Sequence, residues 1–255
     1  MVRLQFCLWM IACVYAQGKE KIKLYFRKGQ SMDKVVAISS WSGGKDSCLA
    51  SYKAIQQGYQ IEYLLHFISK ETKRGCFHGI ESRLMQLQAD ALGLNLIQKE
   101  VSPDMQKYEE EFKEAVSELK VEGIKTMVFG DIYLLDQINW VERVCKDLEV
   151  IPVEPLWNIP PSKVIEEFIE LGFKAIIVSC KADVLGKDFI GRYLDKEVVE
   201  EFKTRNICPC GENGEFHTFV VDGPIFKRKI EILESEPVFK DGFWKHWFLD
   251  IKKYK

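Results

Sequence analysis

Apolar and polar positions alternate along most of the chain in a way that predicts strands followed by helices. Continuous apolar runs such as 34–41 and 61–68 are typical of strands covered on both faces of a sheet. Between them lie segments with apolar residues every three or four positions, and Gly58, Gly93 and Gly123 follow these predicted helices. Strands are predicted at 34–41, 61–68, 94–101, 126–132 and 150–153, and helices at 47–57, 80–92, 102–122 and 135–148.

The order of strand, helix and strand predicts right-handed crossovers and a parallel sheet. The pattern changes after residue 157, where turn signals and aromatic residues become frequent. We therefore predict an α/β fold: a Rossmann-like parallel sheet with helices on both faces over residues 32–157, and a smaller α+β domain over residues 158–255. In the second domain, helices are predicted at 160–171 and 193–205, and strands at 175–179, 216–222 and 226–233. The aromatic run 243–248 is expected to close this domain's core, the alternative being a docking surface.

Composition is that of a globular protein, with 47% hydrophobic and 29% charged residues in a chain of 255. The formal net charge of -2 favours no nucleic-acid partner. The eight cysteines include no Cys-x-x-Cys pair, which weakens a zinc, iron–sulfur or thioredoxin-like interpretation. We expect a reduced, cytoplasmic protein without a membrane partner; a homo-oligomer is an open possibility.

The first 31 residues do not fit this pattern. Arg3 and the apolar run 4–16 resemble a secretory signal, with Val14-Tyr15-Ala16 as a cleavage site. The alternative is a start assigned too far upstream, because Met32 stands directly before the first predicted strand. We expect residues 1–31 to be a disordered or non-native extension, with secretion as the alternative.

Residues 42–47 read Ser-Gly-Gly-Lys-Asp-Ser and lie between the first predicted strand and the first predicted helix. Such a turn directs backbone N–H groups and the positive end of a helix at one point, where an anion can bind. Its two glycines allow close approach, its lysine adds a positive charge and its serines add donors. The Walker A spacing is absent, because Asp46 follows Lys45. The segment predicts an anion site; the alternative is an ordinary glycine turn.

Ligands of a parallel sheet bind beyond the carboxyl ends of its strands. The loop at 42–47, the loop at 69–79 and the pair Gly130-Asp131 all follow predicted strands. They are therefore expected to share one rim of the sheet.

A second group of polar residues lies at 210–218, around the turn-forming pair Asn213-Gly214. Alternation along a following strand would place Glu215 and His217 on one face. Carboxylates and an imidazole beside a turn can orient a substrate, hold a metal or move protons. The alternative is a surface hairpin with ordinary polar residues.

Together, the segment at 42–47 and the sequence Gly-Glu-Asn-Gly-Glu-Phe-His-Thr at 211–218 resemble the diphthine–ammonia ligases of archaeal type. These belong to the PP-loop superfamily of N-type ATP pyrophosphatases, whose motif Ser-Gly-Gly-x-Asp-Ser the first segment matches. The resemblance covers about residues 32–235. Further matching pieces are Phe77-His78, Gly130-Asp131-Ile132, Trp140-Val141-Glu142, Glu154-Pro155-Leu156-Trp157, Leu185-Gly186-Lys187 and Gly191-Arg192.

This resemblance implies ATP-dependent amidation of diphthine, a modified histidine of translation elongation factor 2, to diphthamide. ATP would activate the diphthine carboxylate as an acyl-adenylate with release of pyrophosphate, and ammonia would then displace AMP. The chain beyond Met32 has no room for a glutaminase domain, so free ammonium is the expected nitrogen source.

The resemblance also implies site residues. ATP, with Mg²⁺, is expected at Ser42, Gly43, Gly44, Lys45, Asp46, Ser47, His78, Gly130 and Asp131. The diphthine and ammonia side is expected at Glu212, Asn213, Gly214, Glu215, His217 and Thr218. Catalytic roles are expected for Lys45, Asp46 and Glu215; the metal ligands are not identified. Asp131 could instead cap the next helix, and His78 could be a packed or surface histidine.

Two other functions stay open. A PP-loop enzyme that modifies tRNA, a thiolase or a lysidine-type ligase, would share the fold, but thiolases of this group typically carry Cys-x-x-Cys pairs and a tRNA partner favours a basic surface. A nucleotide-binding sensor without catalysis could use the same scaffold, because fold alone does not decide function.

Overall fold

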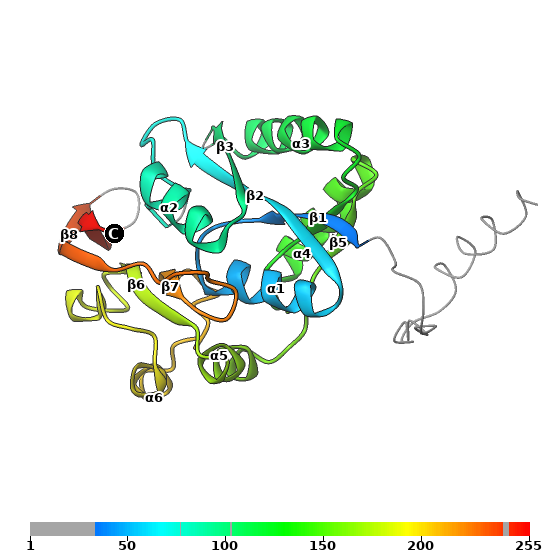
Figure 1. Ribbon diagram of the computed structural model, residues 1–255. Helices are drawn as coiled ribbons and strands as arrows, with labels where there is room; N and C mark the ends of the chain where they lie inside the picture. The colour runs from blue at the N-terminus through cyan, green and yellow to red at the C-terminus, as the bar shows by residue number, and fades with distance from the viewer. Residues whose placement is uncertain (1–33, 77, 103, 242–244) are drawn as a thin grey trace, which may run out of the picture. The chain divides into compact units, whose positions relative to one another are not determined.

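Two sheets organise the computed structural model, which describes residues 34–76, 78–102, 104–241 and 245–255 (Figure 1). Residues 34–255 form one compact unit. The predicted extension over residues 1–31, Phe77 of the resemblance, and the start of the aromatic run 243–248 lie outside the described residues. Among the described helices, none has the length and apolar character needed to cross a membrane.

The first sheet has five strands, all parallel, in the order β3-β2-β1-β4-β5. This confirms the predicted parallel sheet. The fourth strand is shorter than predicted: Phe129 N still donates to Val153 O of the fifth strand at 2.9 Å, but Gly130 then packs against the first turn of the first helix. The strands are β1 (Val35–Ser40), β2 (Tyr59–Ser69), β3 (Asn95–Val101), β4 (Thr126–Val128) and β5 (Ile151–Val153).

Helices cover both faces of this sheet, as predicted. Successive side chains of β1 point to opposite faces, so that Ala37 lies in the core with α1 and α2 while Ile38 lies in the core with α3 and α4. Two apolar cores result, one on each face, and both sides of β1 are buried. The helices are α1 (Lys45–Gln56), α2 (Ser82–Leu92), α3 (Met105–Val121) and α4 (Leu135–Asp147).

The second sheet is antiparallel, in the order β7-β6-β9-β8, and its buried residues continue the core of α1 and α2. This separate antiparallel sheet agrees with the predicted α+β character of the C-terminal part. The division at residue 157 into two domains stays a prediction. The elements are α5 (Pro161–Glu170), β6 (Lys174–Lys181), the 3-10 turn η1 (Lys187–Phe189), α6 (Lys196–Thr204), β7 (Phe216–Asp222), β8 (Ile232–Asp241) and β9 (Lys245–Tyr254).

The strand predicted at 226–233 is wrong for most of its length, because β8 begins only at Ile232. The chain first makes a turn, in which Phe226 N donates to Gly223 O at 2.9 Å, and Lys227 N then donates to Ala91 O at the end of α2, at 2.8 Å. The second of these bonds ties the start of the segment to a helix, and the chain returns to β7 only at Ile230, whose N–H donates to Val221 O at 2.8 Å. The end of the aromatic run lies in β9, a strand that the sequence analysis did not predict.

Candidate active site

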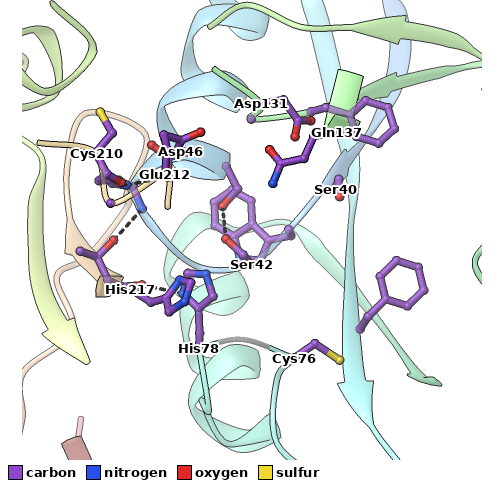
Figure 2. Close-up of a pocket in the computed structure, with 18 of the residues that line it drawn as sticks. Ser40, Ser42, Asp46, Cys76, His78, Asp131, Gln137, Cys210, Glu212 and His217 are labelled. Atoms are coloured by element: carbon purple, nitrogen blue, oxygen red, sulfur yellow. Dashed lines mark hydrogen bonds and ion pairs between the residues drawn. The ribbon is translucent and has the colours of Figure 1, made fainter. Parts of the chain in front are cut away.

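A cavity of about 440 Å³ lies beyond the carboxyl ends of β1, β2 and β4 (Figure 2). Its walls come from the glycine loop (residues 42–47), the loop after β2, the pair Gly130-Asp131, and the segment 210–218 before and within β7. The three loops after the parallel strands therefore share one rim, as predicted. The second polar segment, more than 160 residues away in the sequence, faces the same cavity.

The glycine loop turns sharply at Gly43, whose φ of +78° favours glycine. Gly44 is the N-cap of α1, and its N–H donates to Ser42 Oγ at 3.2 Å. Ser47 Oγ donates back to Gly44 O at 3.2 Å. The first turn of α1 thus begins at the cavity wall, where the positive end of a helix favours an anion.

Lys45 is buried and holds its ammonium group between two oxygens. Nζ donates to Asp46 Oδ2 at 2.7 Å and to the carbonyl oxygen of Cys210. Burial alone would lower the pKa of Lys45, but the nearby negative groups, Asp46 first among them, raise that pKa above its ordinary value. Lys45 therefore stays charged and connects the glycine loop with the segment at 210–218.

Strand β7 is hydrogen-bonded to the glycine loop. Thr218 Oγ1 accepts from Lys45 N at 3.1 Å, and Val220 N donates to Gly43 O at 2.9 Å. Thr218 O accepts from His78 Nδ1 at 2.9 Å. Thr218, predicted to bind substrate, lines the cavity, but its side chain is bonded to the backbone of the loop. The two parts of the chain are therefore joined at the site.

Two imidazoles lie side by side on one wall, as Figure 2 shows, with the ring centroids of His78 and His217 4.7 Å apart. Burial lowers the pKa of His78 to about 4, and burial together with the charge that His78 can carry lowers the pKa of His217 well below its usual value. Both rings are therefore neutral at pH 7. Neutral imidazoles can accept hydrogen bonds but are poor proton acceptors at this pH.

Three carboxylates gather on the opposite side of the cavity, where Glu212 lies beside Asp46 (Figure 2). Burial and the charge of Asp46 raise the pKa of Glu212 to about 7. Burial raises the pKa of Asp131 to about 6, with Asp46 adding to the shift. Burial also raises the pKa of Asp46 itself, against the opposing effect of Lys45. This is the part of the site that can take up a proton near neutral pH.

Four of the predicted site residues do not line the cavity: Gly43, Gly44, Asn213 and Glu215. Glu215 is buried, and its carboxylate accepts from Cys208 N at 3.3 Å, from Asn213 N at 2.9 Å and from Asn213 Nδ2 at 3.0 Å. These three bonds organise the turn that carries Glu212. The geometry thus favours Glu212, and not Glu215, as the carboxylate that faces a substrate.

Replacing Glu215 by Gln is expected to lower the free energy of unfolding by about 1–3 kcal/mol, because an amide nitrogen would face backbone N–H donors that then lack an acceptor. Thermal unfolding of the variant measures this. The matched control is Glu234→Gln, on an exposed strand, which should leave the melting temperature nearly unchanged. An unchanged melting temperature for both variants would show that the turn does not need the carboxylate.

Gly130 packs directly against the first turn of α1. A Cβ added there would lie 2.9 Å from the backbone carbon of Asp46 and 2.9 Å from Ser47 N. Backbone atoms cannot move aside as a side chain can, so only glycine fits between β4 and the glycine loop. The predicted role of Gly130 at the nucleotide site is consistent with this close approach.

Gly130→Ala is expected to displace the glycine loop and to weaken ATP binding by 10-fold or more, about 1.4 kcal/mol. Titration calorimetry with ATP checks the affinity. Gly186→Ala is the control, because an added Cβ there meets no atom within 4 Å. Equal ATP affinity in the Gly130→Ala and wild-type chains would contradict the tight fit.

The sequence analysis missed one wall of the cavity, which is apolar and aromatic. Tyr108 of α3 packs edge-on against Phe67 at the end of β2, with ring centroids 5.7 Å apart, and Phe129 follows β4. The sequence analysis placed Tyr108 within a predicted helix and gave it no role at the site. A flat apolar surface beside an anion-binding turn suits a purine base.

His66 was also missed. It is 2% exposed, and its Nδ1 lies 2.8 Å from Trp41 O, so that this nitrogen carries the proton. Nε2 has no hydrogen-bond partner among the described residues, and burial lowers the pKa of the ring. His66 lies within a mostly apolar strand, where a lone histidine is expected to be part of the core, so no sequence signal distinguished it.

Magnesium ions bind oxygen ligands and keep several waters beside phosphate groups. Asp46 Oδ1 is buried and lacks a partner among the described residues, and Asp131 shares its cavity. Within the described residues, no group of three or more acidic, histidine or cysteine side chains forms a cage for a metal. The donor set therefore fits a hydrated ion held largely by a nucleotide.

The fold and the cavity define a protein of the α/β class, with an anion-binding glycine loop at the carboxyl edge of a parallel sheet. Two family descriptions match the chain, the diphthamide synthase N-terminal domain over residues 33–152 and the diphthamide synthase C-terminal domain over residues 160–255. Together they cover most of the described residues. The chain belongs to the diphthamide synthase family, as the resemblance predicted.

Curated relatives agree with this assignment. The chain is 31% identical to a diphthine–ammonia ligase of Bos taurus over 77% of its own length and 82% of that protein. It is 29% identical to a diphthine–ammonia ligase of Danio rerio over 83% and 92%. Among solved structures, a U34-tRNA thiolase of Methanococcus maripaludis aligns with a TM-score of 0.34 at 16% identity over 55% of this chain and 59% of the other. A match at that level supports no statement about activity.

Proposed function

We propose that this chain amidates diphthine on translation elongation factor 2, using ATP and ammonium and forming diphthamide, AMP and pyrophosphate. The observation that carries the proposal is that the glycine loop and the segment at 210–218 face one cavity and are bonded to each other. A ligase that activates a carboxylate needs a phosphate-binding turn and an acceptor side within reach. Family membership supports the same substrate.

The nucleotide half of the reaction falls to the glycine loop. The first-turn amides of α1 and the hydroxyls of Ser42 and Ser47 hold the terminal phosphates. Lys45, fixed between Asp46 and the Cys210 carbonyl, offsets charge on the departing pyrophosphate. The adenine rests against the aromatic wall of Phe67, Tyr108 and Phe129. Asp46 and Asp131 would hold a hydrated Mg²⁺ ion, which would add Lewis-acid stabilisation of the phosphates.

The acceptor half falls to Glu212. Bound ammonium must lose a proton before its nitrogen can attack, and the acceptor with a pKa matched to neutral pH is Glu212, not the neutral imidazole of His217. Ammonia then attacks the acyl carbon, a C–N bond forms and the bond to AMP breaks. His78 and His217 serve as hydrogen-bond partners on the wall that the acyl group reaches.

The decisive experiment is incubation of the full chain with ATP, ammonium and elongation factor 2 that carries diphthine. Conversion of the carboxylate to an amide lowers the mass of the factor by about 1 Da, and AMP must appear in equal amount. Adenylation of a tRNA in place of the factor would favour the tRNA-modifying alternative. Nucleotide binding without AMP formation on either substrate would favour the sensor.

A further inference from the structure

Gln88 of α2 places a buried side-chain amide against the backbone of the glycine loop. The residue is 0% exposed. Nε2 donates to Gly43 O at 3.0 Å and to Val220 O at 2.6 Å, while Oε1 accepts from Trp41 Nε1 at 2.9 Å. Both amide hydrogens and the amide oxygen are thereby engaged. A buried amide that is satisfied in this way is held in one orientation.

The group that this contact orients is the carbonyl of Gly43, which also accepts from Val220 N at 2.9 Å. In a planar trans peptide, the C=O and the N–H of the next residue point in opposite directions. Holding Gly43 O toward α2 and β7 therefore turns the N–H of Gly44 to the other side, where it meets Ser42 Oγ. Glycine at Gly43 would otherwise leave the orientation of this peptide free.

We propose that Gln88 is a positioning residue, which locks the Gly43–Gly44 peptide so that its N–H holds the Ser42 hydroxyl at the cavity wall, where a diphosphate would bind. Among the described residues, its hydrogen bonds go to backbone groups and Trp41, and it does not line the cavity, so it acts through the loop and not on the substrate. The lock joins three segments distant in sequence: the glycine loop, α2 and β7. The inference rests on the nucleotide half of the proposed function and is independent of diphthine.

The test is titration calorimetry of the full chain with inorganic pyrophosphate and, separately, with adenosine. Gln88→Met keeps the length of the side chain but loses all three hydrogen bonds. Gln88→Glu keeps the acceptor for Trp41 but sets a carboxylate oxygen against Gly43 O and Val220 O. Pyrophosphate affinity is expected to fall about 10-fold in Gln88→Met and at least as far in Gln88→Glu. Adenosine affinity is expected to change less than about threefold, because the aromatic wall is elsewhere.

The control is Gln86→Met on the same helix, whose exposed side chain bonds only to Asp90 among the described residues and should leave both affinities unchanged. Equal losses for pyrophosphate and adenosine, or no loss in either folded Gln88 variant, would overturn the proposal. If Gln88→Met does not fold, Gln88→Asn, with the amide withdrawn by one methylene, replaces it. A wild-type chain that fails to bind pyrophosphate overturns this inference as well, whereas pyrophosphate binding without diphthine amidation overturns only the proposed function.

Discussion

Replacing Lys45 by methionine is expected to lower the rate of AMP formation by about 1,000-fold, the effect of removing a preorganised charge from a developing anion. The fold should survive with a loss of about 1–3 kcal/mol in the free energy of unfolding, since Asp46 and the Cys210 carbonyl lose their shared donor. ATP should still bind, because the loop amides remain. AMP release, measured beside ATP affinity and the melting temperature, separates these effects.

Lys53→Met is the matched control, because Lys53 lies on the same helix and pairs at 2.7 Å with Glu167, both side chains being part-exposed and neither lining the cavity. Loss of such a pair should cost about 1 kcal/mol of stability, and AMP formation should be unchanged. Near-normal turnover in Lys45→Met would remove this lysine from the mechanism. Complete loss of ATP binding would instead assign it to ground-state binding.

The second large effect is expected for Glu212→Gln. Amide formation should fall 100-fold or more, as when a general base is removed, while exchange of labelled pyrophosphate into ATP in the presence of the diphthine-bearing factor should continue. The reason is that Glu212 lines the cavity beside the glycine loop, while the hydrogen bonds that shape the loop come from other side chains among the described residues. If pyrophosphate exchange and amide formation fall to the same extent, Glu212 acts in nucleotide binding or carboxylate activation and not in the attack by ammonia.

The pH dependence of the rate provides a separate check on Glu212. Its pKa of about 7 lies above the ordinary value, so the carboxylate is protonated and inactive below pH 7 and becomes an acceptor above it. The ratio of wild-type to Glu212→Gln rates is therefore expected to rise with pH and to level off above about pH 7. Taking the ratio removes the titration of ammonium itself, and a ratio independent of pH would exclude this role.

Much of the nucleotide half could be predicted from the sequence because local rules define it. A strand, a glycine turn and a helix follow one another without interruption at residues 34–57, and local sequence signals suffice to place these three elements. Gly130 and Asp131 were placed on the same rim by the topology of parallel strands alone. The short distance between Gly130 and α1 is a tertiary detail, and only the structure supplies it.

The part of the site assigned to diphthine and ammonia was harder to predict. It depends on which carboxylate of the segment at 210–218 faces the cavity. Alternation along a strand favoured Glu215 and His217. Glu215, however, lies before β7, and its carboxylate accepts hydrogen bonds from Asn213 within the turn. Gln88 lies in an ordinary amphipathic helix, and His66 lies in a mostly apolar strand. Neither the hydrophobic periodicity nor the residue spacing distinguishes them from their neighbours. Their partners, Gly43 and Trp41, lie 45 and 25 positions away in the sequence.

The bonds from Lys45 to Thr218 and from Val220 to Gly43 bear on how the protein can be divided. A fragment ending before residue 160 would keep every strand of the parallel sheet yet lose the acceptors and donors that shape its own anion-binding turn. Expressed alone, such a fragment should lack the native conformation at residues 42–47 and bind ATP weakly. Mixed with the complementary fragment, it should bind ATP only when the two fragments associate. The glycine loop and the segment at 210–218 thus form one surface around the cavity, and neither part of the chain carries all of it.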